Sequence, residues 1–328
     1  MPPPADTVAA LPVRKDEPSV RSPGRNPGDR VYAAVLGALG GAVLVVVGLV
    51  VYELAVVAAP TARTGGVGFL ASSDWDPVQG SFGALPFVYG TLVTSAIALL
   101  VALPISVGLA LFLSEMGPPR LRPVVTFAIE TLAAIPSVVY GLWGLFVMVP
   151  WLRQTVQPAL GKALGFLPLF QGPPIGLGYL AGGLILAVMI LPTITSVTSE
   201  VLKTVPPALR EGALALGATR WEAIRIAILP YARPGILGAA LLGLGRALGE
   251  TMAVTMVIGN SPEIHASLFA PGYSLPAVIA NEFAEATGAL HTGALAALAL
   301  VLFGLALVLN SLARLLVQVV ARGPRVAS

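Results

Sequence analysis

Arg246 is the side chain in this sequence most suited to chemistry, because it lies inside an otherwise apolar run. The run GILGAALLGLGRALGETMAVTMVIG begins at Gly235, and Arg246 follows eleven residues later. If the run crosses a membrane as a helix, the guanidinium lies about 16 Å into a hydrocarbon layer about 30 Å thick. A central arginine costs about 2.5–3.5 kcal/mol on insertion scales, so a partner or a function is expected. Glu250, four residues on, would share its helix face, with Thr251 beside it.

Two interpretations of this charge pair stay open. A guanidinium presents a planar fork of donors that matches an oxyanion, so Arg246, Glu250 and Thr251 are predicted to form an anion-responsive site on a translocation path. Glu250 would then orient Arg246 while the site is empty. The alternative is a structural ion pair inside a helix bundle. Gly243, Gly245 and Gly249 leave space beside the pair, either for a solute or, more commonly, for close helix packing.

The composition indicates the elements that position these residues. The 328 residues are 56% hydrophobic and only 11% charged, against about 25% charged in soluble domains. This excludes a soluble globular enzyme, and it excludes disorder over most of the length. We therefore predict an all-α integral membrane protein with six transmembrane helices, each near or above the roughly 20 apolar residues that a bilayer requires. The predicted spans are 31–58, 84–113, 124–149, 178–198, 235–258 and 293–317.

The same pattern divides the chain into three parts. Residues 1–30 are Pro-rich, charged and without apolar periodicity, and we predict a disordered cytoplasmic tail there. Residues 31–320 form the transmembrane domain, and residues 321–328 form a second cytoplasmic tail. Mid-span prolines at positions 104, 136 and 192 predict kinks.

The distribution of basic residues predicts the orientation. Of the 19 Lys and Arg residues, 15 fall on one side of the predicted spans, and Arg63, Arg153 and Lys162 fall on the other. The positive-inside rule therefore places both termini in the cytoplasm. Arg246 lies within a span.

The cytoplasmic loop at 199–234 predicts a helix–turn–helix. Thr204 would cap a first helix that ends at Gly217, a typical C′ residue. Thr219 and Glu222 fit a capping box that starts a second helix, which Pro230 would end. An apolar stripe on the second helix would follow i, i+3, i+7 spacing at Trp221, Ile224 and Ile228. The loop either packs on its own bundle or docks a cytoplasmic partner as a helix in a groove.

Several kinds of chemistry have no support in the sequence. The absence of cysteine excludes thiolate metal sites and Cys nucleophiles, and two histidines leave little room for a His-based metal site. No triad or carboxylate pair indicates catalysis, and no basic-aromatic patch indicates nucleic acid. None of the three lysines lies in a Gly-x₄-Gly-Lys-Ser/Thr loop, so this chain binds no ATP of its own. Acidic residues of the external loops, including Glu282, are expected to be solvated.

The 199–234 loop resembles the EAA loop of ABC importer permeases. The matching residues are Glu211-Gly212-Ala213-Leu214-Ala215-Leu216-Gly217, followed by Leu229-Pro230 twelve residues on. The sequence departs from the family pattern at Gly212, which replaces an Ala, and at Ala227, which replaces an Ile. The resemblance implies that the loop forms a coupling helix in a cleft of an ATP-binding subunit. The contact would lie around Gly217, Arg220 and Trp221.

Further stretches resemble the PstC-type permeases of phosphate ABC importers. The matching stretches are 243–254 (GLGRALGETMAV), 255–260 (TMVIGN), 104–115 (from PIS to LSE) and 135–144 (IPSVVYGLWG). The resemblance covers roughly residues 31–320 and implies a fold like that of type I ABC importer permeases, in a bacterial inner membrane. It also implies that Arg246 and Glu250 are the intramembrane charges implicated in phosphate passage.

This resemblance implies partners as well. They are a PstA-type permease forming a heterodimer, a PstB-type ATPase dimer that carries the ATP, and a periplasmic PstS-type phosphate-binding protein. The residues alone indicate only an anion. A permease for another oxyanion such as molybdate or sulfate, a passive anion channel, and a structural scaffold therefore remain alternatives.

Overall fold

The computed structural model describes residues 27–66 and 68–321, which fall in two compact units, Met1–Tyr52 and Glu53–Ser328. The described part of the first unit is one helix, the beginning of α1 (Pro27–Gly65). No residue in the most apolar 18-residue window of α1 is buried. The predicted tail falls largely on residues 1–26, which lie outside the described residues, and the helix begins at Pro27 rather than at Val31.

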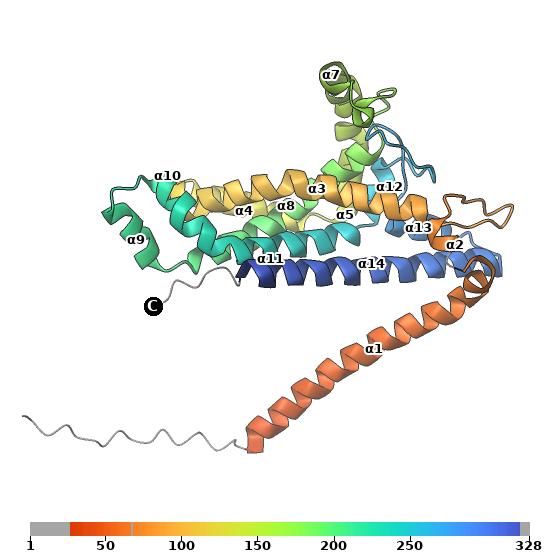
Figure 1. Ribbon diagram of the computed structural model, residues 1–328, viewed down its shortest axis with the longest axis horizontal. Coiled ribbons are helices and arrows are strands. Elements are labelled where there is room, and N and C mark those ends of the chain that lie inside the picture. The colour runs from red at the N-terminus through yellow and green to blue at the C-terminus, as the bar shows by residue number, and fades with distance from the viewer. Residues whose placement is uncertain (1–26, 67, 322–328) are drawn as a thin grey trace, which may run out of the picture. The chain divides into compact units, whose positions relative to one another are not determined.

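Four long helices of the second unit run side by side (Figure 1). They are α3 (Leu85–Leu111), α8 (Tyr179–Lys203), α11 (Leu229–Leu248) and α14 (Ala289–Ala321). Helices α3 and α8 approach closely because Gly183 has no side chain, and a Cβ there would lie 2.5 Å from Ile97. The hydroxyl of Ser106 on α3 also donates to the carbonyl of Leu191 on α8 at 3.1 Å. A buried apolar cluster that includes Ala98, Ala102, Leu186 and Ile190 fills this interface.

The predicted span 124–149 is not one straight helix. Helix α4 (Arg122–Ala134) bends by 98° into a second helical stretch, Ser137–Leu164. That stretch comprises α5 (Ser137–Trp143), η2 (Gly144–Met148), α6 (Val149–Trp151), η3 (Leu152–Val156) and α7 (Gln157–Leu164). Pro136 has no N–H to donate to the carbonyl of Leu132, which accepts instead from the hydroxyl of Tyr140 at 2.7 Å and from the N–H of Ile135 at 3.4 Å. The carbonyl that the proline leaves without its usual partner is therefore satisfied, as backbone at membrane depth requires.

The helix found in place of the predicted span 235–258 begins and ends at other residues. A continuous helical stretch begins with α10 (Arg220–Ala223), passes through the π-helical turn η5 (Ile224–Ile228) and continues as α11. The prediction that Pro230 ends the second loop helix is therefore wrong. In η5 the N–H of Leu229 bonds to the carbonyl of Ile224, five residues back, and this wider turn accommodates the proline that follows. The helix then stops at Leu248, and α12 (Met252–Val257) starts after a break.

Shorter elements complete the second unit. They are α2 (Gly68–Ala71), η1 (Phe112–Met116), η4 (Pro168–Phe170), α9 (Pro207–Ala215) and α13 (Leu275–Glu282). Within residues 27–66 and 68–321, five helices are long and apolar enough to cross a membrane, or six if the bent pair at Pro136 is one span. This confirms the all-α class. The cytoplasmic placement of the termini stays a prediction, and residues 322–328 lie outside the described part.

Candidate functional site

Arg246 lies in the last turn of α11, and its side chain is exposed on the isolated chain. Its recorded polar contact is a long hydrogen bond in which Nη1 donates to Oγ1 of Thr193 on α8, at 3.5 Å. A bond of this length contributes little, because hydrogen bonds weaken steeply near this limit. Most of the donors of the guanidinium fork are therefore available to another group.

Glu250 does not pair with Arg246, although a continuous helix would have placed the two residues on the same face. Because α11 ends at Leu248, Glu250 falls in the break and not one turn further along the same face. Its Oε1 accepts from the N–H of Ala253 at 3.3 Å, so the carboxylate caps the first turn of α12. Thr251 lies in the same break, and its hydroxyl donates to the carbonyl of Gly249 at 3.4 Å.

The glycines beside Arg246 have two different roles. A Cβ on Gly243 would lie 2.7 Å from the side chain of Ile194, so this glycine allows α11 and α8 to pack closely. A Cβ on Gly245 would meet nothing within 4 Å. The packing interpretation therefore holds for Gly243, whereas the surroundings of Gly245 are open.

The loop between α8 and α11 is a helix–turn–helix, as predicted. Helix α9 is followed by Gly217 with φ +86°, the left-handed conformation that glycine adopts readily after a helix. The capping box is present, because Thr219 Oγ1 accepts from the N–H of Glu222 at 3.3 Å while Thr219 N–H donates to Oε2 of Glu222 at 2.7 Å. Thr204 is not a cap; its hydroxyl donates to the carbonyl of Val201 at 2.7 Å.

The outer surface of this loop carries large apolar side chains. Trp221 is 55% exposed and Leu216 is 92% exposed, whereas Ile224 and Ile228 are buried. The predicted stripe of three residues therefore divides, with the isoleucines facing the bundle and Trp221 facing outward. Exposed apolar side chains gathered in one place are typical of an interaction surface. The remaining predicted coupling residues lie around this surface: Glu211, Gly212 and Arg220 are exposed, Ala213 is buried, and Leu229 and Pro230 are half-buried in the first turn of α11.

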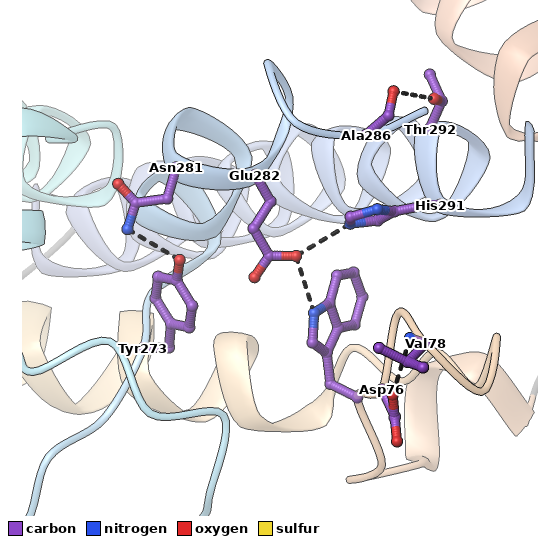
Figure 2. Close-up of polar contacts among 9 residues, drawn as sticks. Asp76, Val78, Tyr273, Asn281, Glu282, Ala286, His291 and Thr292 are labelled. Carbon is purple, nitrogen blue, oxygen red and sulfur yellow. Dashed lines mark hydrogen bonds and ion pairs between the residues drawn. The ribbon is translucent and has the colours of Figure 1, made fainter. Parts of the chain in front are cut away.

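A second cluster of polar contacts joins three segments distant in sequence (Figure 2). Oε2 of Glu282 accepts from Nε1 of Trp75 at 3.1 Å and lies 3.0 Å from Nε2 of His291. The expectation that Glu282 is simply solvated is wrong. The hydroxyl of Tyr273 accepts from Nδ2 of Asn281 at 2.9 Å, and burial raises the pKa of Tyr273 to about 12, so this tyrosine stays uncharged at cellular pH. The cluster fixes the segment around Trp75 to α13 and α14.

The family is shown by comparison with known proteins. Residues 102–322 match the model of the family described as "Binding-protein-dependent transport system inner membrane component". The chain belongs to this family. Membership makes it a multi-pass membrane protein and a permease component of an ABC transporter, and the matched residues include both the Arg246 region and the helix–turn–helix loop.

Curated relatives within the family are similar over most of their length. Phosphate transport system permease protein PstC of Mesorhizobium japonicum is 48% identical over 299 residues, which cover 90% of this chain and 91% of the relative. The PstC of Haemophilus influenzae is 50% identical over 259 residues, covering 78% and 82%. PstC 2 of Mycobacterium tuberculosis is 37% identical over 295 residues, covering 88% and 91%.

Two solved structures share the family fold at low sequence identity. One is the MetNI methionine ABC transporter in inward facing conformations, with a TM-score of 0.56 and 19% identity over 73% of this chain and 96% of that one. The other is a bacterial alginate ABC transporter, with a TM-score of 0.58 and 18% identity over 88% and 96%. At these identities the likeness concerns the fold alone.

The structure brings the two predicted sites onto one continuous stretch. Arg220 and Trp221 lie at the start of α10, and Arg246 lies at the end of α11, in the helical stretch Arg220–Leu248. Sequence reasoning missed Thr193 as a neighbour of Arg246, because the two are 53 residues apart on different helices. The proximity of Gly249 to the predicted pair was the signal that could have located the break, since glycine commonly follows a helix end.

Proposed function

We propose that this chain is the permease subunit of an ATP-driven importer of inorganic phosphate. The observation that carries the proposal is the identity of 48–50% to proteins named phosphate transport permease PstC, over 78–90% of the chain. In the proposed mechanism, phosphate crosses by alternating access, and ATP hydrolysis on partner subunits supplies the energy. The chain itself binds no cofactor and catalyses no reaction.

The exposed apolar surface of the loop supports the ATPase contact. Trp221 and Leu216 offer bulky side chains to a groove on a partner, and the charged residues Glu211 and Arg220 lie beside them. A docked helix of this kind uses apolar anchors for affinity and surrounding charges for orientation. We assign this contact to a PstB-type ATPase dimer.

The continuous stretch from Arg220 to Leu248 supports a direct mechanical connection. The 26 residues between Arg220 and Arg246 span roughly 39 Å at helical rise, which exceeds the hydrocarbon thickness of about 30 Å. A displacement at the ATPase contact therefore moves the end of α11 without an intervening flexible loop. This end carries Arg246.

Arg246 supports the passage of an anion. Its guanidinium has one long hydrogen bond to Thr193 and no ion pair among the described residues, so its fork is free for an oxyanion. Glu250 and Thr251 lie in the helix break a few residues on, where the backbone is irregular. Irregular backbone at membrane depth is tolerated where it lines a protein interior or a water-filled path.

The roles proposed for this chain and for the ATPase imply the remaining members of the assembly. A PstA-type permease would form the other half of the path, and a PstS-type binding protein would deliver phosphate to the external loops. The test begins with purification of the tagged chain from its native membranes and identification of the proteins that copurify. We expect a second permease and an ATPase. If the purified chain still transports phosphate but no ATPase copurifies with it, the ATP-driven mechanism is refuted.

The substrate is tested in proteoliposomes that contain the purified complex and its binding protein. We expect ATP-dependent uptake of radiolabelled phosphate that excess molybdate and sulfate do not compete away. Equal or better uptake of either of those anions would refute phosphate as the substrate. Uptake that proceeds without ATP would identify a passive channel.

A further inference from the structure

We propose that an ion pair between Arg210 and Glu115 transmits the movement of the coupling loop to helix α3. Arg210 lies on α9, the first helix of the loop that makes the proposed ATPase contact, and Glu115 lies on η1, the π-helical end of the α3 span. The inference rests on the proposed function, because it concerns how ATP hydrolysis is coupled to transport. Both are positioning residues and contact no substrate.

The geometry of the pair is that of a two-bond fork. Nε of Arg210 donates to Oε2 of Glu115 at 3.0 Å, and Nη2 donates to Oε1 at 2.5 Å. The two residues are 95 positions apart, so the contact joins separate elements. A bidentate arginine–carboxylate pair fixes orientation as well as distance, since both partners are planar.

Burial distinguishes this pair from an ordinary surface ion pair. The side chain of Glu115 is 9% exposed and that of Arg210 is 34% exposed. By contrast, the nearby pair of Lys203 and Glu200 on α8 is 61% and 70% exposed. Exposed pairs contribute little, whereas removal of one partner from a buried pair leaves an uncompensated charge. The Arg210–Glu115 contact is therefore persistent, and the Lys203–Glu200 pair provides a matched control.

Helix α9 packs mainly on η5 and α10. Ala213 is its one buried residue, and it is a small one. The ion pair itself borders a cavity of about 270 Å³, which is lined also by Leu214, Arg220 and Ile224. Because this cavity leaves α9 loosely packed on that side, a force applied to α9 reaches η1 mainly through the two hydrogen bonds of the fork.

Movement of η1 would reach Thr193, the residue on α8 that contacts Arg246 at the candidate anion site. Helix α3 leads directly into η1, and Ser106 of α3 donates to the carbonyl of Leu191 on α8 at 3.1 Å. Thr193, two residues further along α8, is the residue that Arg246 contacts. The loop is joined by the chain itself to α8 and α11, which carry Thr193 and Arg246. The ion pair adds α3, which is not a chain neighbour of the loop, so that α3 moves together with α8 and α11 when the loop is displaced.

Loss of the pair should uncouple the two activities. The experiment compares R210E, E115R and the charge-swapped double variant in the reconstituted complex, with phosphate uptake and ATP hydrolysis measured on the same vesicles. We expect phosphate transported per ATP hydrolysed to fall about tenfold in each single variant, within the usual range of couplings between sites. The double variant should recover most of this ratio, and K203E should match the unsubstituted complex.

The possible results distinguish a loss of coupling from a loss of structure. Equal ratios in R210E, E115R and the unsubstituted complex would overturn the inference, and so would single variants that lose both activities in proportion while remaining assembled. If a charge reversal prevents assembly, R210K keeps the charge but removes the fork, and an unchanged ratio in R210K would overturn the inference. The sequence contains no cysteine, so E115C/R210C can also be joined by a short thiol cross-linker, which should raise the ratio above that of the unlinked protein.

A result that refutes the proposed function differs from one that refutes the ion-pair inference. An unsubstituted complex that hydrolyses ATP but carries no phosphate would refute the substrate assignment, and the same ratio can then be measured with the anion that it does carry. A complex that carries phosphate normally, with R210E and E115R unaffected, would refute the ion-pair inference alone.

Discussion

Replacing Arg246 by Gln should separate transport from folding. The side chain is exposed, and its one hydrogen bond to the part of the chain that the structure describes is the 3.5 Å bond to Thr193, so the substitution leaves no cavity and no buried unpaired group. The expected change in the free energy of unfolding is below about 0.5 kcal/mol, as for other exposed positions. If the guanidinium binds phosphate, however, each lost hydrogen bond to the charged group removes about 1.5–3 kcal/mol, which corresponds to a roughly 10- to 150-fold fall in uptake.

The assay measures initial rates of ATP-dependent phosphate uptake in proteoliposomes over a range of phosphate concentrations, together with the melting temperature of each purified complex. Arg246→Lys keeps the charge but loses the fork, and it should fall between the native protein and Arg246→Gln. Arg314→Gln on α14 is the control for an exposed arginine elsewhere, and it should leave uptake unchanged. Native uptake rates in Arg246→Gln would refute the role assigned to the guanidinium.

Three further substitutions test the bend, the turn and the docking surface. Tyr140→Phe removes the shorter of two hydrogen bonds to the carbonyl of Leu132 and leaves the 3.4 Å bond from the N–H of Ile135, so it should destabilise the protein by about 0.5–1.5 kcal/mol, seen as a lower melting temperature; an unchanged melting temperature would show that the Ile135 N–H is sufficient. Gly217→Ala places a side chain at φ +86° and should cost about 1–3 kcal/mol, with weaker retention of the ATPase during purification as the readout. Trp221→Ala should release the ATPase without lowering the melting temperature of the chain, whereas Trp151→Ala, which is equally exposed at 55%, should retain it.

Sequence reasoning succeeded where the determining interactions are local. The capping box at Thr219 and Glu222 and the turn at Gly217 depend on residues within one helical turn of each other, so their spacing predicts them. The apolar spans are also local, because about 20 consecutive apolar residues suffice. The roles assigned to Arg246, Glu250 and Thr251 in transport remain predictions.

The kink predicted at Pro136 is confirmed, as a 98° bend between α4 and the helical stretch that follows. The errors arose where the hydrogen bonding of a helix departs from the regular pattern of bonds four residues apart. Pro230 predicted a helix end, but the π-helical turn before it allows the helix to continue. The shared helix face expected of Arg246 and Glu250 assumed a helix through Gly249, where the helix in fact ends. Such departures depend on packing between distant segments, and this information is absent from any short window of sequence.

The length of α1 has a consequence for the lipid that surrounds it. Its largely apolar run, residues 31–59, measures roughly 43 Å along the axis, about one and a half times the thickness of a typical hydrocarbon layer. A helix with this mismatch must lean over or extend beyond the bilayer, and each ångström of difference between helix and lipid carries a modest energy. The angle of α1 should therefore change with acyl chain length, so the thickness of the host membrane becomes a variable to which this protein responds.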